Sequence, residues 1–230
     1  MFKKKKNQVD NNVRHLITKI NPKSPISEQY RTLRTNIKFS GVDKKIRSLL
    51  VTSSEPAAGK SMTAANLAIV FAQQGLKTLL IDGDMRRPTV HYTFRIDNLR
   101  GLSNAVIDSL TFEGIAIKSD IANLDIIPSG PVPPNPSELL ASQRFEDGLN
   151  HAYEKYDMII IDSPPVLAVT DAQVIAHKFD GVIIVARSKQ TETEQLKEAV
   201  ELIKRVQGDV LGTVLNDVKK TDNHNYYYYG

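Results

Sequence analysis

Six short, continuous apolar runs constrain the fold of this chain more than any other feature of its sequence. Their residues are mostly aliphatic or β-branched and consecutive rather than alternating, which is typical of strands in a sheet that is covered on both faces. The runs span residues 47–53, 77–84, 123–130, 156–165, 181–187 and 210–217. The pattern therefore predicts a buried sheet as the framework of the molecule.

Helical patterns fill several of the intervals between these runs. They cover residues 61–74, closed by Gly75, residues 137–156, and residues 191–207, closed by Gly208. Alternation of strands and helices implies an α/β domain with a parallel sheet and right-handed crossovers. A length of 230 residues suits one such domain with a sizeable core.

Two terminal regions lie outside this pattern, and the sequence divides into residues 1–23, 24–218 and 219–230. The first is a basic extension, the second is the α/β domain, and the third is a polar tail that we expect to be flexible. Ser24 as a cap and Pro25 at the first helical position predict a helix over residues 24–39 at the start of the domain. One apolar stripe of this helix contains Ile26, Tyr30, Leu33 and Ile37.

Composition excludes several classes of protein. The chain has no cysteine, which rules out a disulfide framework and thiolate metal sites. It has no apolar run of about 18 residues and no apolar segment behind its basic N-terminus, so we expect a cytoplasmic chain. The net charge of +4 does not predict a nucleic-acid partner. The lysine run 3–6 is interpreted as a solvated tail, with attraction to anionic lipid as the alternative.

The stretch SSEPAAGKSM, residues 53–62, is similar to a phosphate-binding loop, although Ser54 stands where the pattern G-x-x-x-x-G-K-[ST] has its first glycine. It follows a predicted strand and precedes a predicted helix, as such a loop does. Lys60 is predicted to reach the β- and γ-phosphates, and the Ser61 hydroxyl to bind Mg²⁺. Backbone N–H groups would bind phosphate at the helix N-terminus, from Ala57, Ala58, Gly59, Lys60, Ser61 and Met62. The alternative is an ordinary helix start.

Three aspartates follow two of the apolar runs. Asp82 and Asp84 come at the end of one run and Asp162 near the end of another. A metal at a parallel-sheet nucleotide site takes carboxylates from the carboxyl ends of neighbouring strands. A single aspartate in such a place is more often a turn former. Three of them, together with the loop, predict a site for a nucleotide and Mg²⁺.

The loop and the motifs LLIDGDMR and IIIDSPP resemble the three Walker-type motifs of the bacterial tyrosine kinase family, in the separate cytoplasmic form of Gram-positive bacteria. The segments SPISEQYRTLRTN, SGPVPPNPSELL and TDAQ and the tyrosine-rich end resemble the same family. The resemblance implies a P-loop NTPase-like fold and an ATP- and Mg²⁺-dependent protein tyrosine kinase. The loop departs from the family with Ala57 and Ala58 where a glycine is usual, and with Met62 where a second hydroxyl usually follows Ser61.

The same motifs are related to those of partitioning and division-site ATPases, which carry a signature lysine five residues before the P-loop lysine. Glu55 stands at that position and argues against this class. A nucleotide-switched assembly ATPase without kinase activity is nevertheless the main alternative. A module that binds nucleotide without turnover is the third.

The resemblance also implies roles for individual residues. It assigns Asp82 as the base that accepts the proton of the attacking tyrosine, while Ser61, Asp84 and Asp162 complete a metal shell that can include Asp82. Sequence alone does not decide which aspartate is base and which is ligand. The acceptors are the four consecutive tyrosines of the tail, Tyr226, Tyr227, Tyr228 and Tyr229, with a docked aromatic plug as the alternative.

Glu28, Arg31 and Arg34 follow one another at intervals of three on the first predicted helix. Helical phase places them on the side away from the apolar stripe, hence exposed. An intrahelical pair between Glu28 and Arg31 is the local interpretation. The resemblance instead matches them to a self-association motif, used head-to-tail in a closed ring that delivers each tail to the next protomer.

The resemblance implies partners as well. They are the cytoplasmic tail of a transmembrane activator, which recruits the chain to the inner face of the membrane, other tyrosine substrates, and a tyrosine phosphatase. It further implies control of exopolysaccharide or capsule synthesis.

Overall fold

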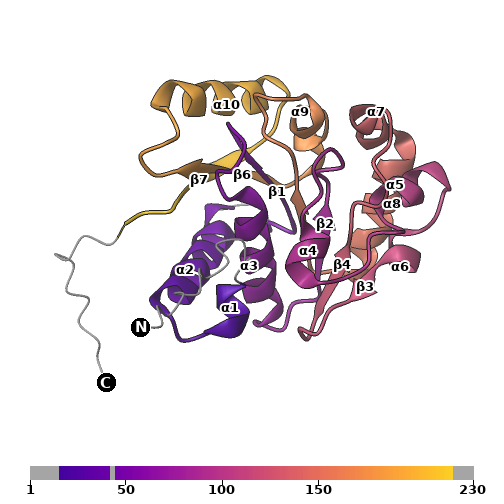
Figure 1. The fold of residues 1–230 in the computed structure, drawn as a ribbon, viewed down its shortest axis with the longest axis horizontal. Coiled ribbons are helices and arrows are strands. Elements are labelled where there is room, and N and C mark those ends of the chain that lie inside the picture. The colour runs from indigo at the N-terminus through magenta and orange to yellow at the C-terminus, as the bar shows by residue number, and fades with distance from the viewer. Residues whose placement is uncertain (1–15, 42–44, 220–230) are drawn as a thin grey trace, which may run out of the picture.

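The computed structural model describes residues 16–41 and 45–219. Seven strands form one sheet with the order β3-β4-β2-β5-β1-β6-β7, and helices cover both of its faces (Figure 1). Every neighbouring pair is parallel except β3 and β4, which are antiparallel. The strands are β1 Ser48–Ser53, β2 Thr78–Asp82, β3 Ile117–Lys118, β4 Leu124–Ile127, β5 Met158–Asp162, β6 Gly181–Arg187 and β7 Val210–Asn216. The predicted α/β class with a P-loop NTPase-like sheet is confirmed.

All six predicted strands are present, most of them shorter at their ends than the apolar runs. Consecutive apolar residues are explained by burial on both faces: Leu49 and Val51 of β1 belong to one hydrophobic cluster, and Leu50 belongs to the other. The edge strand β3 has only two residues and was not predicted, because a segment this short carries no periodic pattern.

The helices differ more from the prediction. They are α1 Ile17–Ile20, α2 Pro25–Ser40, α3 Lys60–Ala72, α4 Val90–Phe94, α5 Leu102–Ile107, α6 Phe112–Ile115, α7 Pro136–Ala141, α8 Gln143–Lys155, α9 Asp171–Ile175 and α10 Thr193–Arg205, with a 3₁₀ turn at Ala176–Lys178. The single helix predicted over residues 137–156 is wrong, because Ser142 is extended and its side chain accepts a hydrogen bond from the N–H of Phe145, which starts α8.

Helix α3, which begins within the P-loop, is buried almost all round. One side packs on the sheet, and the other is covered by α1 and α2 (Figure 1). The N–H and hydroxyl of Thr18 in α1 donate to Oδ1 of Asn66 at 3.0 and 2.8 Å. The folded domain therefore includes residues 16–23, which the sequence had assigned to the N-terminal extension.

Helix α2 presents a different buried stripe from the one predicted. As expected, the buried face of α2 packs in the hydrophobic cluster that contains Leu49 and Val51, through Tyr30, Leu33 and Ile37. Ile26, however, is 48% exposed, and Ser27 is buried in its place. The hydroxyl of Ser27 donates to the carbonyl of Asn21 at 2.7 Å and lies 3.2 Å from that of Ile17, which turns this face of the first turn toward α1. The four tail tyrosines, at 226–229, lie outside the described residues.

Candidate active site

The P-loop connects β1 to α3 through two residues with positive φ, Ala57 at 62° and Gly59 at 95°. Gly59 is required for two reasons: its left-handed conformation, and the 2.0 Å that would separate an added Cβ from Nδ2 of Asn216. Ser54 does not have a positive φ, so the missing first glycine imposes no backbone strain. Ala57 is the residue that holds a strained conformation in place of a glycine.

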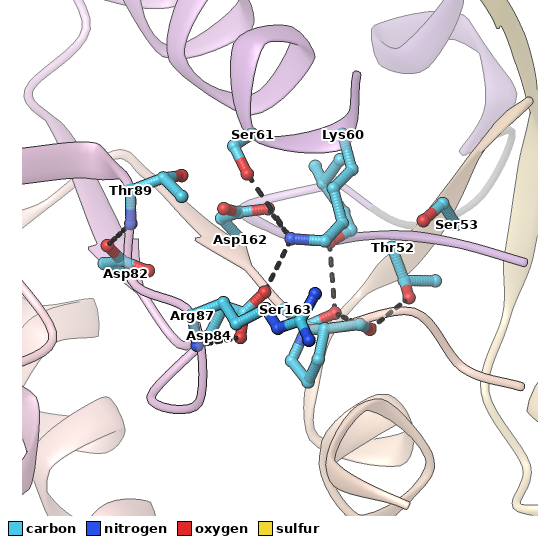
Figure 2. A network of polar contacts seen from close by, with 12 residues as sticks. Thr52, Ser53, Lys60, Ser61, Asp82, Asp84, Arg87, Thr89, Asp162 and Ser163 are labelled. Atoms are coloured by element: carbon cyan, nitrogen blue, oxygen red, sulfur yellow. Dashed lines mark hydrogen bonds and ion pairs between the residues drawn. The ribbon is translucent and has the colours of Figure 1, made fainter. Parts of the chain in front are cut away.

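The P-loop lysine lies among three of the side chains that the sequence assigned to the metal. Nζ of Lys60 is 2.9 Å from Oδ2 of Asp84, 3.4 Å from Oδ1 of Asp162 and 3.3 Å from Oγ of Ser61 (Figure 2). Burial by itself would lower the pKa of Lys60, but the carboxylates of Asp162 and Asp84 outweigh it, so that the pKa is raised. Lys60 is therefore held as a cation between two buried anions.

Asp82 lies beside this group but is held differently. It is fully buried at the end of β2, and its Oδ2 accepts the N–H groups of Thr89 and Val90 at 3.0 and 2.9 Å, at the start of α4. In the strand register Asp82 is paired with Asp162 of β5. Burial, with a smaller contribution from the charge of Asp162, raises the pKa of Asp82 to about 7.

The arrangement fits a divalent metal only in part. In the described part of the chain, no three acidic, histidine or cysteine side chains converge closely enough to hold an ion by themselves. Two carboxylates and one hydroxyl surround Lys60, and Mg²⁺ is usually bound through one or two carboxylates together with substrate phosphates and water. Oδ1 of Asp82 and Oδ2 of Asp162 are buried and accept no hydrogen bond within the described residues. These residues fit a metal that arrives with phosphate ligands of its own.

Comparison with known proteins decides the family. Residues 46–216 match the model of an AAA domain. The chain is 45% identical to the tyrosine-protein kinase YwqD of Bacillus subtilis over 226 residues, which are 98% of this chain and 95% of that one. It also matches the crystal structure of the chimerical protein CapA2B2, with a TM-score of 0.86, 44% identity, and coverage of 89% of this chain and 90% of that one. This chain belongs to the bacterial tyrosine kinase family.

The enzyme is thus a P-loop protein-tyrosine kinase, similar to the Gram-positive kinase YwqD. Longer members exist too: the chain is 36% identical to the tyrosine-protein kinase wzc of Salmonella typhimurium over 211 residues, 91% of this chain but only 29% of that protein. Among the residues that the structure describes, no helix is both long and apolar enough to cross a bilayer.

Two further residues of the loop have defined contacts in the structure. The side chain of Met62 is partly buried and packs against the hydrophobic cluster to which most of α3 belongs. Glu55 accepts a hydrogen bond at 2.6 Å from the hydroxyl of Thr191, so its carboxylate ties the P-loop to the segment before α10.

Sequence reasoning missed the groups that hold the aspartate loop in place. The guanidinium of Arg86 donates twice to the buried carboxylate of Asp171, with both distances 3.0 Å, and so joins the loop after β2 to the start of α9. The backbone N–H groups that hold Asp82 were missed too. Only the capping potential of the segment RRPT before α4 could have signalled them.

The three residues of the expected self-association motif are less exposed than helical phase suggested. Glu28 is exposed, but Arg31 pairs with it and also donates to the carbonyl of Pro22 at 2.6 Å. Arg34 is half-buried, and its guanidinium donates to the carbonyl of Val70 in α3 at 2.8 Å. The intrahelical pair is thus present, and Arg34 is turned inward because α2 packs on α3. A role in assembly stays a prediction.

Proposed function

We propose that this chain is an ATP- and Mg²⁺-dependent kinase that phosphorylates its own C-terminal tyrosines in trans, within a ring of identical subunits. The observation that carries the proposal is the convergence on the P-loop of two paired carboxylates, Asp84 and Asp162, and of a third with an unbonded buried oxygen, Asp82. Two of these charges suit a metal with its nucleotide, and the third is left for proton transfer.

The nucleotide would lie on the N-terminal turn of α3. Backbone N–H groups of residues 57–62 would bind its phosphates, and Lys60 would neutralise the charge between them. Ser61, Asp84 and Asp162 would hold Mg²⁺. When bound, that ion would supply positive charge that stabilises the negative charge developing during transfer. The chain's own residues thus position the phosphates and neutralise their negative charge.

Asp82 is the residue we assign as general base. The phenol of tyrosine has a pKa near 10, so it attacks more readily if a carboxylate takes its proton as the new bond forms. The tyrosine oxygen then bonds to the γ-phosphorus, the bond to ADP breaks, and the proton goes to the carboxylate. A pKa of about 7 lets Asp82 be charged at physiological pH and still hold the proton it receives.

The remaining parts of the proposal concern assembly and control. Glu28, Arg31 and Arg34 would contact the next subunit, and Tyr226 to Tyr229 would enter its site. The transmembrane activator that the family resemblance implies belongs to the same proposal. Recruitment to the inner membrane face, a counteracting tyrosine phosphatase and control of capsule or exopolysaccharide synthesis belong to the same proposal.

Peptide mass spectrometry before and after incubation with ATP and Mg²⁺ tests the proposal, with the Lys60→Met variant in parallel. We expect phosphate on Tyr226 to Tyr229 in the natural chain and none in the variant. Replacement of the four tyrosines by phenylalanine should remove most of the phosphate. The double variant Arg31→Ala and Arg34→Ala should no longer form the ring, and its sedimentation coefficient should fall. ATP hydrolysis without tyrosine phosphate, even with an activator's cytoplasmic tail added, would instead indicate an assembly ATPase.

A further inference from the structure

The cluster at the P-loop has an excess of buried negative charge. Asp82 and Asp162 are completely buried and Asp84 is nearly so, whereas the cation Lys60 is in direct contact with Asp84 and Asp162 only. Isolated buried carboxylates are unfavourable, and the usual remedy is a paired cation. Lys60 therefore has a role besides binding phosphate, since it neutralises the negative charge of aspartates in its own protein.

The atoms that hold Lys60 are also the atoms proposed to hold the metal. Its ammonium lies within 3.4 Å of Oδ2 of Asp84, Oδ1 of Asp162 and Oγ of Ser61 (Figure 2). Mg²⁺ binds oxygen ligands at about 2.0 to 2.1 Å. An ammonium and a divalent ion cannot use the same three oxygens at once, because both the space and the sign of the charge conflict.

A nucleotide offers Lys60 a second set of anionic partners. Lys60 is the first residue of α3, so phosphates bound at that helix N-terminus would lie close to its side chain. Rotation of the flexible lysine stem toward the phosphates would release Asp84 and Asp162. The phosphates would then supply the further oxygens that these two carboxylates and Ser61 lack.

We propose that Lys60 is the resident cation of the aspartate cluster and that it excludes divalent metal until a nucleotide draws it away. Metal would then enter with the nucleotide or after it, and not before. The inference rests on the proposed nucleotide site, and it goes further in assigning an order of binding to that site.

Binding of Mn²⁺ alone, followed by electron paramagnetic resonance, tests the inference. The natural chain should bind no Mn²⁺ in the cluster until a non-hydrolysable ATP analogue is added. Lys60→Met leaves the carboxylates without their cation, so this variant should bind Mn²⁺ without nucleotide at least about tenfold more tightly than the natural chain does. Adding Asp162→Asn to Lys60→Met should abolish the gain.

Lys178→Met is the matched control. Lys178 is another largely buried lysine, with 12% of its side chain exposed against 10% for Lys60, and it is paired with Glu146 of α8. Its replacement should not alter Mn²⁺ binding. A natural chain that binds Mn²⁺ alone as tightly as Lys60→Met does, or a folded Lys60→Met that gains no Mn²⁺ binding, would overturn the inference.

A measurement on the natural chain keeps the test valid if Lys60→Met does not fold. Mg²⁺ alone should leave the melting temperature unchanged, whereas Mg²⁺ should raise it once the ATP analogue is present. Stabilisation by Mg²⁺ alone would contradict the inference. Neither readout depends on phosphorylated tyrosine, so a failed kinase assay and a failed order of binding can be told apart.

Discussion

The two ends of strand β1 carry polar clusters of similar composition that are bonded in very different ways. At the N-terminal end, Oδ2 of Asp180 accepts the N–H groups of Arg47 and Ser48 at 2.9 and 3.0 Å. Oγ of Ser48 accepts both the N–H of Asp180 at 2.8 Å and the hydroxyl of Tyr153 at 2.5 Å. At the other end, Oδ1 of Asp82 and Oδ2 of Asp162 are buried and accept no hydrogen bond from any described residue, although the second oxygen of each carboxylate is bonded.

The difference distinguishes the end of the sheet that stabilises the fold from the end that is proposed for chemistry. Hydrogen bonds to a buried carboxylate compensate for the loss of its hydration, so such a carboxylate stabilises the fold. A carboxylate with an unbonded oxygen is a cost to the fold, which is tolerated where a ligand or a proton completes it. Substitutions at the carboxyl end of the sheet should therefore impair activity, and substitutions at the opposite end should impair stability.

The largest effect is expected for Asp162→Asn compared with Asp180→Ala. Asp162→Asn should lower tyrosine phosphorylation by about 100-fold or more, because the change removes a charge at the site of transfer, with little loss of stability. Asp180→Ala should cost about 2 to 4 kcal/mol, because two backbone donors lose their partner. Urea unfolding and a phosphotyrosine assay, run at a temperature where both variants are folded, measure the pair. Full activity in Asp162→Asn would remove the distinction.

Gly59→Ala and Gly75→Ala form the next comparison. Both glycines have positive φ, at 95° and 89°, but an added Cβ would meet the Asn216 amide at 2.0 Å only at Gly59 and would find nothing within 4 Å at Gly75. Gly75→Ala should therefore cost only about 1 kcal/mol of backbone strain. Gly59→Ala should cost about 2 to 4 kcal/mol and also weaken nucleotide binding. Equal losses in thermal unfolding would show that Asn216 moves aside freely.

Asp82→Asn should change how stability depends on pH. The pKa of Asp82 is raised from 3.8 to about 7 by folding, so the folded state binds this proton more tightly than the unfolded state does. The stabilisation is complete below about pH 4 and is lost as the pH rises toward 7. In EDTA, the variant should lack this loss, and near pH 8 it should be more stable by on the order of 2 kcal/mol. Parallel pH profiles for the two proteins would argue against a raised pKa.

The smallest effect is expected at Ala57. Its φ of 62° is left-handed, whereas Ala58 does not have a positive φ and is buried in the hydrophobic cluster. Ala57→Gly should be neutral or stabilising by up to about 1 kcal/mol, because relief of strain offsets the extra freedom of the unfolded chain. Ala58→Gly should destabilise by about 1 kcal/mol. Calorimetry that gave the opposite order would disprove the strain at Ala57.

The sequence predicted the central elements because their signals are local. Continuous apolar runs marked the strands, and the order of loop, helix and strand-end aspartate placed Lys60, Asp84 and Asp162 together. Contacts between distant residues left no such signal. Neither the pairing of Thr18 with Asn66 nor that of Arg86 with Asp171 could be expected, since each joins polar residues at least 48 positions apart. The partial burial of Arg34 likewise depends on how α2 packs on α3, which the pattern of α2 alone cannot reveal.

That packing brings α2 into contact with the helix that begins at the P-loop. Arg34 is bonded to the backbone of α3, and Tyr30 packs against the same hydrophobic cluster as Met62, two positions after Lys60. Two helices in contact lie about 8 to 10 Å apart. A neighbouring subunit that displaced Arg34 would therefore act on the phosphate-binding helix directly, without a relay across the sheet. Variants of α2 made to separate the subunits should for this reason be assayed for nucleotide affinity as monomers, because the helix proposed for subunit contact packs against the helix proposed for phosphate binding.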